Sequence, residues 1–168
     1  KADKEKIAQE KKAYIRKAVI EASGAARREA RQSVLADNND KIKEAGLAAR
    51  KEIVDNLRAE YQDRINSAIK EVNVKAKAEG RVATPEEKKA SWFPMWEEAL
   101  AAKQEEINEA VKNARIEIRD RVLEENKALI DEAVSKAGDE AREKARAEFD
   151  RSVLTGSAIV EDVKSFGG

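Results

Sequence analysis

The stretch that decides the fold is residues 96–133, WEEALAAKQEEINEAVKNARIEIRDRVLEENKALIDEA. Apolar residues recur in it every eleven positions, in two series that run four residues apart. The first series is Trp96, Ile107, Ile118 and Leu129, and the second is Leu100, Val111, Val122 and Ala133. Eleven residues over three turns give about 3.67 residues per turn, slightly more than the 3.6 of a straight α-helix. The stretch therefore predicts a long helix whose narrow apolar face packs along another helix.

Two further long helices are predicted before this stretch. Residues 1–36 read as a basic N-terminal helix, and residues 37–40, Asp-Asn-Asn-Asp, favour a break because their side chains compete for backbone hydrogen bonds. Whether the helix continues through that break is left open by the sequence. Residues 40–79 read as a second long helix with an apolar stripe at Ile42, Ala49, Ile53, Leu57, Tyr61, Ile65, Ile69, Val72 and Ala76.

A corner is predicted over residues 80–94. Gly80 is placed to end the second helix as a left-handed cap. Thr84, Pro85 and Glu87 then form a capping box with proline at the first helical position. Pro94 is expected to keep this new helix short, because proline disrupts a helix interior. A third long helix is predicted over 95–155, followed by a short tail helix over 156–168.

These elements predict an all-α fold, an elongated helical hairpin or coiled coil of two or three long helices with eleven-residue periodicity. The composition agrees, since 40% of the residues are charged and only 4% are aromatic. The net charge is zero, but residues 1–35 hold ten Lys or Arg and five Asp or Glu. That segment is therefore a possible contact for an acidic partner or an anionic surface.

The aromatic residues gather in one place, Ser91-Trp92-Phe93-Pro94-Met95-Trp96. Three interpretations stay open: a plug that seals the end of the hairpin, an anchor for a partner protein, and insertion at a membrane interface. We predict a partner-binding surface that joins this cluster to the apolar series. Its residues are Trp92, Phe93, Met95, Trp96, Leu100, Ile107, Val111, Ile118, Val122 and Leu129.

Catalytic, cofactor-binding and metal sites are not expected. The chain has no His and no Cys, so the usual triads and zinc sites lack their residues. Adjacent carboxylates such as Glu105 and Glu106 read as solvated helix faces, and no phosphate-binding glycine loop is present. Nucleic acid is not an expected partner, because acids are interspersed among the basic residues. No apolar run approaches the roughly 20 residues that span a bilayer.

One short stretch, Ala114-Arg115-Ile116-Glu117-Ile118-Arg119-Asp120-Arg121-Val122, resembles in style the b-type peripheral-stalk subunits of rotary ATP synthases. The resemblance extends over Leu100–Phe149, and the chain departs from that family in having no N-terminal membrane span. It implies a stator-like role and identifies no functional residue.

The predicted function is a non-catalytic structural subunit, a strut, tether or scaffold whose partners are other, helical, protein subunits. The alternative is an amphipathic surface-active or protective protein that binds lipid, because eleven-residue repeats also occur in apolipoprotein-like and desiccation-protection chains. The narrow bulky stripe suits helix pairing better than lipid binding.

Overall fold

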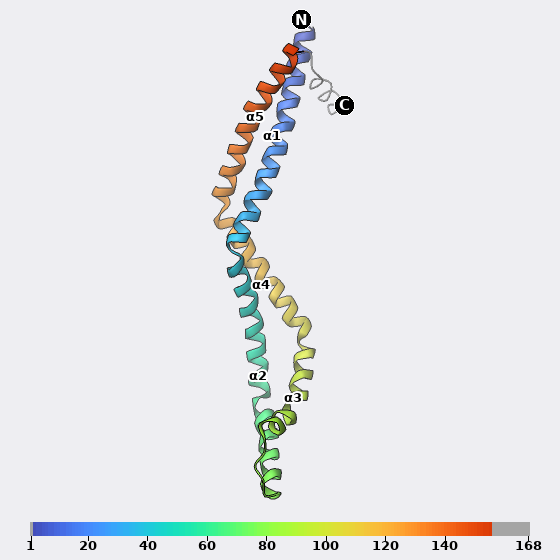
Figure 1. Ribbon diagram of the computed structural model, residues 1–168, viewed down its shortest axis with the longest axis vertical. Coiled ribbons are helices and arrows are strands. Elements are labelled where there is room, and N and C mark those ends of the chain that lie inside the picture. The colour runs from blue at the N-terminus through green and yellow to red at the C-terminus, as the bar shows by residue number, and fades with distance from the viewer. Residues whose placement is uncertain (1, 156–168) are drawn as a thin grey trace. The chain divides into compact units, whose positions relative to one another are not determined.

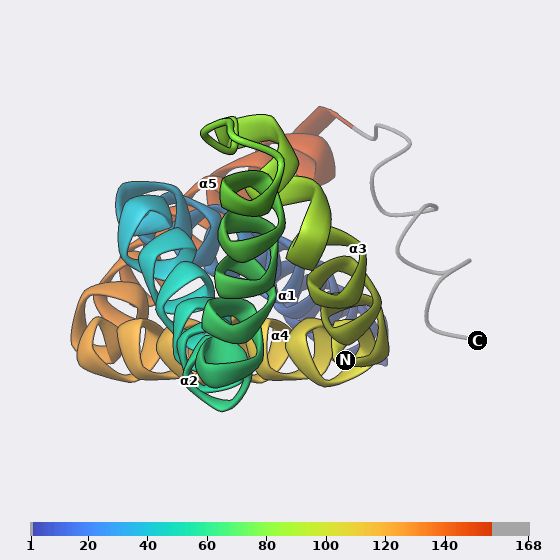
Figure 2. The same ribbon diagram turned by 90° about the horizontal axis from the view of Figure 1, so that it is seen from below.

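The protein is all-helical in a computed structural model that describes residues 2–155. Within that range the ribbon consists of helices joined by short connections and contains no strand (Figure 1 and Figure 2). The helices are α1 (Ala2–Asp37), α2 (Asn39–Ala78), α3 (Pro85–Ala102), α4 (Gln104–Glu125) and α5 (Lys127–Thr155). The tail helix predicted over 156–168 lies outside the described residues.

The described chain divides into two units. The first combines residues 2–38 with residues 121–155, and in it α1 packs against α5. The second is residues 39–120, in which α2 packs against α3 (Figure 1). Each unit thus has its own pair of packed helices.

In the first unit α1 and α5 run antiparallel. Lys11 forms an ion pair with Asp150 at 2.7 Å, and the Tyr14 hydroxyl donates a hydrogen bond to Glu148 at 3.0 Å. Farther along α1, Ser23 lies opposite Gly138 of α5, where an added Cβ would sit 3.1 Å from the Ser23 hydroxyl. Small side chains therefore let these two helices approach closely.

The core of the second unit lies between α2 and α3. Leu57, Trp96 and Ala99 are buried together, and half-buried apolar side chains surround them. Ile65 is almost completely buried on the same helix as Leu57, with an exposed fraction of 1%. The buried positions form a line along each helix, as the apolar stripe of residues 40–79 predicts.

Gly80 ends α2 in the left-handed conformation, as predicted, with a φ of 73°. The Gly80 N–H donates to the Lys77 carbonyl at 3.0 Å, and the Arg81 N–H donates to the Ala76 carbonyl at 3.0 Å. This pair of bonds is a Schellman motif, which satisfies carbonyls left free at the helix end. The predicted capping box is also present, because Thr84 accepts a hydrogen bond from the Glu87 N–H at 3.2 Å.

The corner carries a charge pair that gives a pH prediction. Arg81 donates hydrogen bonds to both carboxylate oxygens of Glu87, at 2.7 and 2.8 Å, and these bonds hold the pKa of Glu87 below its usual value of 4.5. A lowered folded-state pKa stabilises the fold above the unfolded pKa, so this contribution is lost as the pH falls below about 4.5. Carboxyl-carbon NMR titration should show the lowered pKa in the native chain, and Arg81→Ala should return it toward 4.5. An unchanged titration in Arg81→Ala would contradict this assignment.

The single helix predicted over 95–155 is wrong: the chain there forms parts of three helices. Helix α3 begins at Pro85 and runs through Pro94, and breaks follow at Lys103 and Asn126. Pro94 and Ala90 are exposed, so the Ala90 carbonyl that loses its donor is open to water. Packing of the aromatic residues around Pro94 against α2 offsets the lost hydrogen bond.

The joints at Asn38 and Asn126 share one local structure. In each, the asparagine side-chain amide donates to the carbonyl four residues earlier, Val34 or Val122, at 2.8 Å. The same carbonyl also accepts the backbone N–H of the asparagine, at 3.2 Å for Val34 and 3.1 Å for Val122, and the next helix begins one residue later. Helices α1 and α2 are therefore not continuous, which the sequence had left open.

Candidate interaction surfaces

The predicted aromatic cluster lies largely within the second unit. Trp96 is 8% exposed and packs in the core with Leu57. Trp92 and Phe93 are half-buried against that core, with ring centroids 5.9 Å apart at an interplanar angle of 73°. Met95 is also half-buried. This packing against α2 is what the plug interpretation requires.

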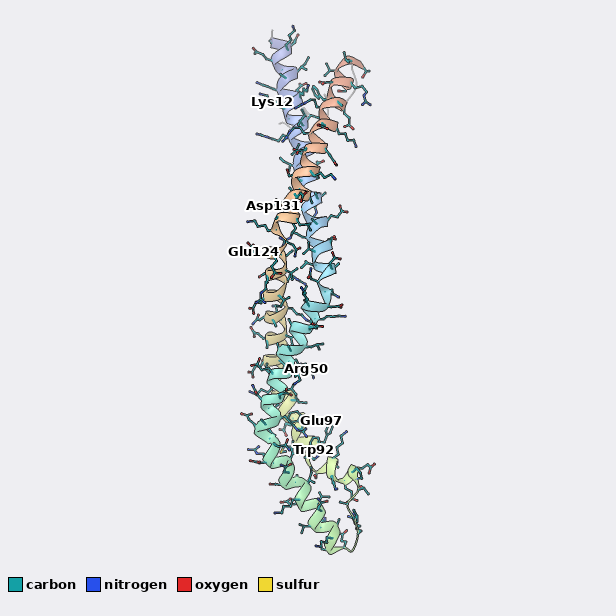
Figure 3. The ribbon with its side chains drawn as sticks, turned by 90° about the vertical axis from the view of Figure 1, so that its left-hand side faces the viewer. Lys12, Arg50, Trp92, Glu97, Glu124 and Asp131 are labelled. Atoms are coloured by element: carbon teal, nitrogen blue, oxygen red, sulfur yellow. The ribbon has the colours of Figure 1, made fainter. Side chains whose placement is uncertain are left out.

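Cations cover the faces of these rings. The Arg58 guanidinium lies 5.0 Å from the ring centroid of Trp92 and 5.4 Å from that of Trp96. The Lys89 ammonium lies 4.7 Å from the ring centroid of Phe93. Cation–π contacts of this kind are each worth about 0.5–1 kcal/mol at exposed sites. Arg58 therefore links α2 to both tryptophans of α3 (Trp92 is labelled in Figure 3).

The rest of the predicted partner-binding surface is not one continuous exposed face. Ile107 and Val122 are buried, with exposed fractions of 2% and 3%. Leu100, Val111 and Ile118 are half-buried. Leu129 is 58% exposed, whereas the adjacent Ile130 is 4% exposed. The break at Asn126 explains why Leu129 is exposed and Ile130 is buried, because it shifts the buried face of α5 by one residue.

A groove of about 570 Å³ lies between α2 and α4 in the second unit. One lining residue, Arg50, comes from α2 (labelled in Figure 3), and the others come from α4. They combine four cations, three apolar residues and two amides: Arg50, Lys112, Arg115, Arg119, Ile107, Val111, Ile116, Gln104 and Asn108. Among residues 2–155, no carboxylate lines the groove.

The cations of this groove have no ionic partner in the part of the chain that the structure describes. Among residues 2–155, none of the four forms an ion pair within 4.0 Å, whereas Lys51, Arg81 and Lys103 elsewhere in the unit do. All four groove cations are exposed. The net charge of the whole chain is zero, so this excess of positive charge is local.

Gly46 of α2 is contacted by side chains of α4 beside the groove. It is buried, and an added Cβ would lie 2.7 Å from Arg115 Nε and 3.2 Å from Val111 Cγ1. The Arg115 side chain therefore lies across α2 at the one position that carries no side chain. Gly46 interrupts an otherwise strong helical pattern, which is the sequence signal that marks such a contact.

Sequence reasoning missed the groove as a site. Lys112, Arg115 and Arg119 are spaced three and four residues apart, which places them on one face of a helix. That spacing is visible in the sequence, but the part played by Arg50 depends on how α2 lies against α4. The predicted surface used only the apolar members Ile107 and Val111.

Within residues 2–155 no three His, Cys, Asp or Glu side chains form a group able to hold a metal ion. None of the helices in that range is both long and apolar enough to cross a membrane. Comparison of the chain with protein families, with curated proteins and with solved structures found no match.

Proposed function

We propose that the chain is a non-catalytic structural helical subunit, which acts as a strut, tether or scaffold in a larger protein assembly. The supporting observation is the length of α1 and α2, 36 and 40 residues, each packed along one other helix. At about 1.5 Å per residue they span about 54 and 60 Å, and both are much longer than an average helix of about 11–12 residues. Long helices packed in pairs separate the points that they connect.

The side chains away from the packed lines suit such a role. They are mostly charged and extend into solvent along the described helices (Figure 3). Some large apolar side chains are also exposed, among them Ile20 at 64% and Leu47 at 63%. The basic residues of 1–35, such as the exposed Arg27 and Arg28, add a candidate contact for an acidic partner.

The finer arrangement belongs to the same proposal. We propose a helical hairpin with eleven-residue periodicity and a stalk-like role, as in the b-type subunits that residues 114–122 resemble. Pairs of buried residues eleven positions apart support the periodicity: Gly46 and Leu57, Ile65 and Ala76, Trp96 and Ile107.

Crosslinking mass spectrometry on the native assembly tests the function. We expect crosslinks from exposed or half-exposed lysines of α4 and the adjoining joints, Lys103, Lys112 and Lys127, to other polypeptides. Crosslinks between α2 and α3 or α4 should appear as internal controls of the fold. A chain that behaves as an isolated monomer, with internal crosslinks only, would contradict the proposal.

Anionic vesicles test the lipid-binding alternative. A strut is helical in buffer, so its far-ultraviolet circular dichroism should change little when vesicles are added. Helicity that appears only with vesicles would favour the surface-active alternative.

A further inference from the structure

We propose that the groove between α2 and α4 binds an acidic amphipathic helix of another polypeptide. This inference rests on the proposed function, because it names the kind of partner that a structural subunit would hold. Its basis is one groove that combines apolar surface with cations that form no ion pair within residues 2–155.

Charge complementarity identifies the acidic partner. Arg50 lies on one wall, and Lys112 and Arg119 lie on the other, seven residues apart on one face of α4. Carboxylates of a bound segment would meet cations from both sides without displacing an ion pair among the described residues. Complementary potentials of this kind raise association rates and exclude basic segments.

The groove also offers apolar surface to the partner. Ile107 is buried beneath it, Val111 is half-buried, and Ile116 is 42% exposed. A highly charged segment without apolar residues would leave Ile116 in contact with water. A segment with an apolar stripe between acidic flanks would cover it, which is the pattern of an amphipathic helix.

The walls of the groove favour a helix over an extended peptide. The backbone N–H and C=O groups of α4 between Gln104 and Arg119 lie within the helix and bond to one another. An extended peptide would find no backbone partners there, whereas a helix satisfies its own. The distance along α4 from Gln104 to Arg119 is about 22 Å at 1.5 Å per residue, which matches a partner helix of about four turns.

A second copy of this chain fits the groove less well. The most acidic stretch that could supply such a helix is residues 97–110, with five glutamates and one lysine. Its apolar residues are already engaged, since Ala99 and Ile107 are buried within the second unit. We therefore assign the groove to a different polypeptide.

The test uses the full chain and a fluorescent synthetic peptide of about 18 residues, with leucines at helical spacing and glutamates on both flanks. We expect saturable binding by fluorescence anisotropy, weakened by added salt, with a gain of peptide helicity. The double variant Lys112→Glu/Arg119→Glu should weaken binding about tenfold or more, because attraction becomes repulsion.

A matched control has the same change of charge at the same spacing. Lys70→Glu/Lys77→Glu reverses two exposed cations of α2, seven residues apart, that do not line the groove. Its affinity for the peptide should stay within about twofold of the native value. Ile116→Ser tests the apolar contact without changing charge and should weaken binding severalfold. Circular dichroism establishes that each variant is folded.

Several outcomes would overturn the inference. They are equal binding of a scrambled peptide of the same charge, equal loss of affinity in the control variant, and absence of peptide binding. Two further outcomes would also overturn it: binding of the chain to vesicles, or reversible dimerisation of the chain, where Lys112→Glu/Arg119→Glu abolishes the effect. Either one would show that the groove has a different occupant. In the native assembly, crosslinks to other polypeptides that avoid Lys112 would contradict the groove but support the structural function. The absence of all such crosslinks would contradict the function itself.

Discussion

Phe149→Ala is expected to lower the free energy of unfolding of the first unit by about 3–5 kcal/mol, the range for truncating a buried aromatic ring. The Phe149 side chain is 0% exposed, and its ring lies 5.9 Å from that of Tyr14 on α1. Alanine would leave a cavity where α5 meets α1. Because whole domains are stable by only about 5–15 kcal/mol, a loss of this size threatens the pairing of the two helices.

Urea denaturation followed by circular dichroism measures this loss, and hydrogen exchange locates it. Protection should fall in α1 and α5 and remain in α2 and α3, because those pairs belong to different units. Leu154→Ala is the matched control on the same helix. Leu154 is 87% exposed, so its truncation should change stability by no more than about 0.5 kcal/mol. Equal effects of the two substitutions would show that Phe149 is not a core residue.

Trp96→Ala is expected to destabilise the second unit by a similar amount, about 3–5 kcal/mol. The indole fills the space between α2 and α3 beside Leu57, and the Arg58 guanidinium stacks on it. Alanine would remove both contacts. Hydrogen exchange should show that amide protection is lost in α2 and α3 and is kept in α1 and α5.

Two further variants separate the contributions to the effect of Trp96→Ala. Val82→Ala truncates a side chain that is 88% exposed in the same unit and should have little effect. Arg58→Ala removes the cation but keeps the indole, so we expect a loss of about 1 kcal/mol from the two cation–π contacts. A stable Trp96→Ala variant would leave the partner-anchor interpretation of the aromatic cluster as the better one, since the plug requires Trp96 to hold α3 on α2.

The helices and their caps could be predicted because their signals are local. The capping box at Thr84 and the left-handed Gly80 depend on residues within a few positions. The apolar stripe of α2 follows from helical periodicity alone, and Leu57 and Ile65 are buried as it predicts.

The breaks in the third predicted helix could not be predicted in the same way. The eleven-residue series assumes one unbroken helix, and Lys103 and Asn126 are residues that a helix interior also tolerates. Passage of α3 through Pro94 depends on aromatic packing against another helix, which periodicity does not report. One consequence is that Leu129 is exposed to solvent and Ile130 is buried in its stead.

The pairing of helices depends on contacts between distant segments. The sequence left open whether the N-terminal helix folds back, and the structure pairs it with α5. The small residues of both helices are compatible with this pairing, since Ala30 of α1 and Ala137 of α5 line the same surface groove. The groove is hidden for the same reason, because Arg50 of α2 joins the cations of α4 only in the folded second unit.

The division of the first unit into two separate segments has a consequence for biosynthesis. The entire second unit lies between α1 and α5 in sequence. During translation, α1 leaves the ribosome first and stays unpaired until α5 has been synthesised. Residues 39–120 can fold in the meantime through contacts of their own. A waiting helix lined with bulky apolar residues would be prone to aggregate. The packed line of α1 combines the bulky Tyr14, Val19 and Val34 with half-buried alanines, Ala18, Ala22, Ala26 and Ala30, and the alanines reduce the apolar surface that is exposed before α5 is synthesised.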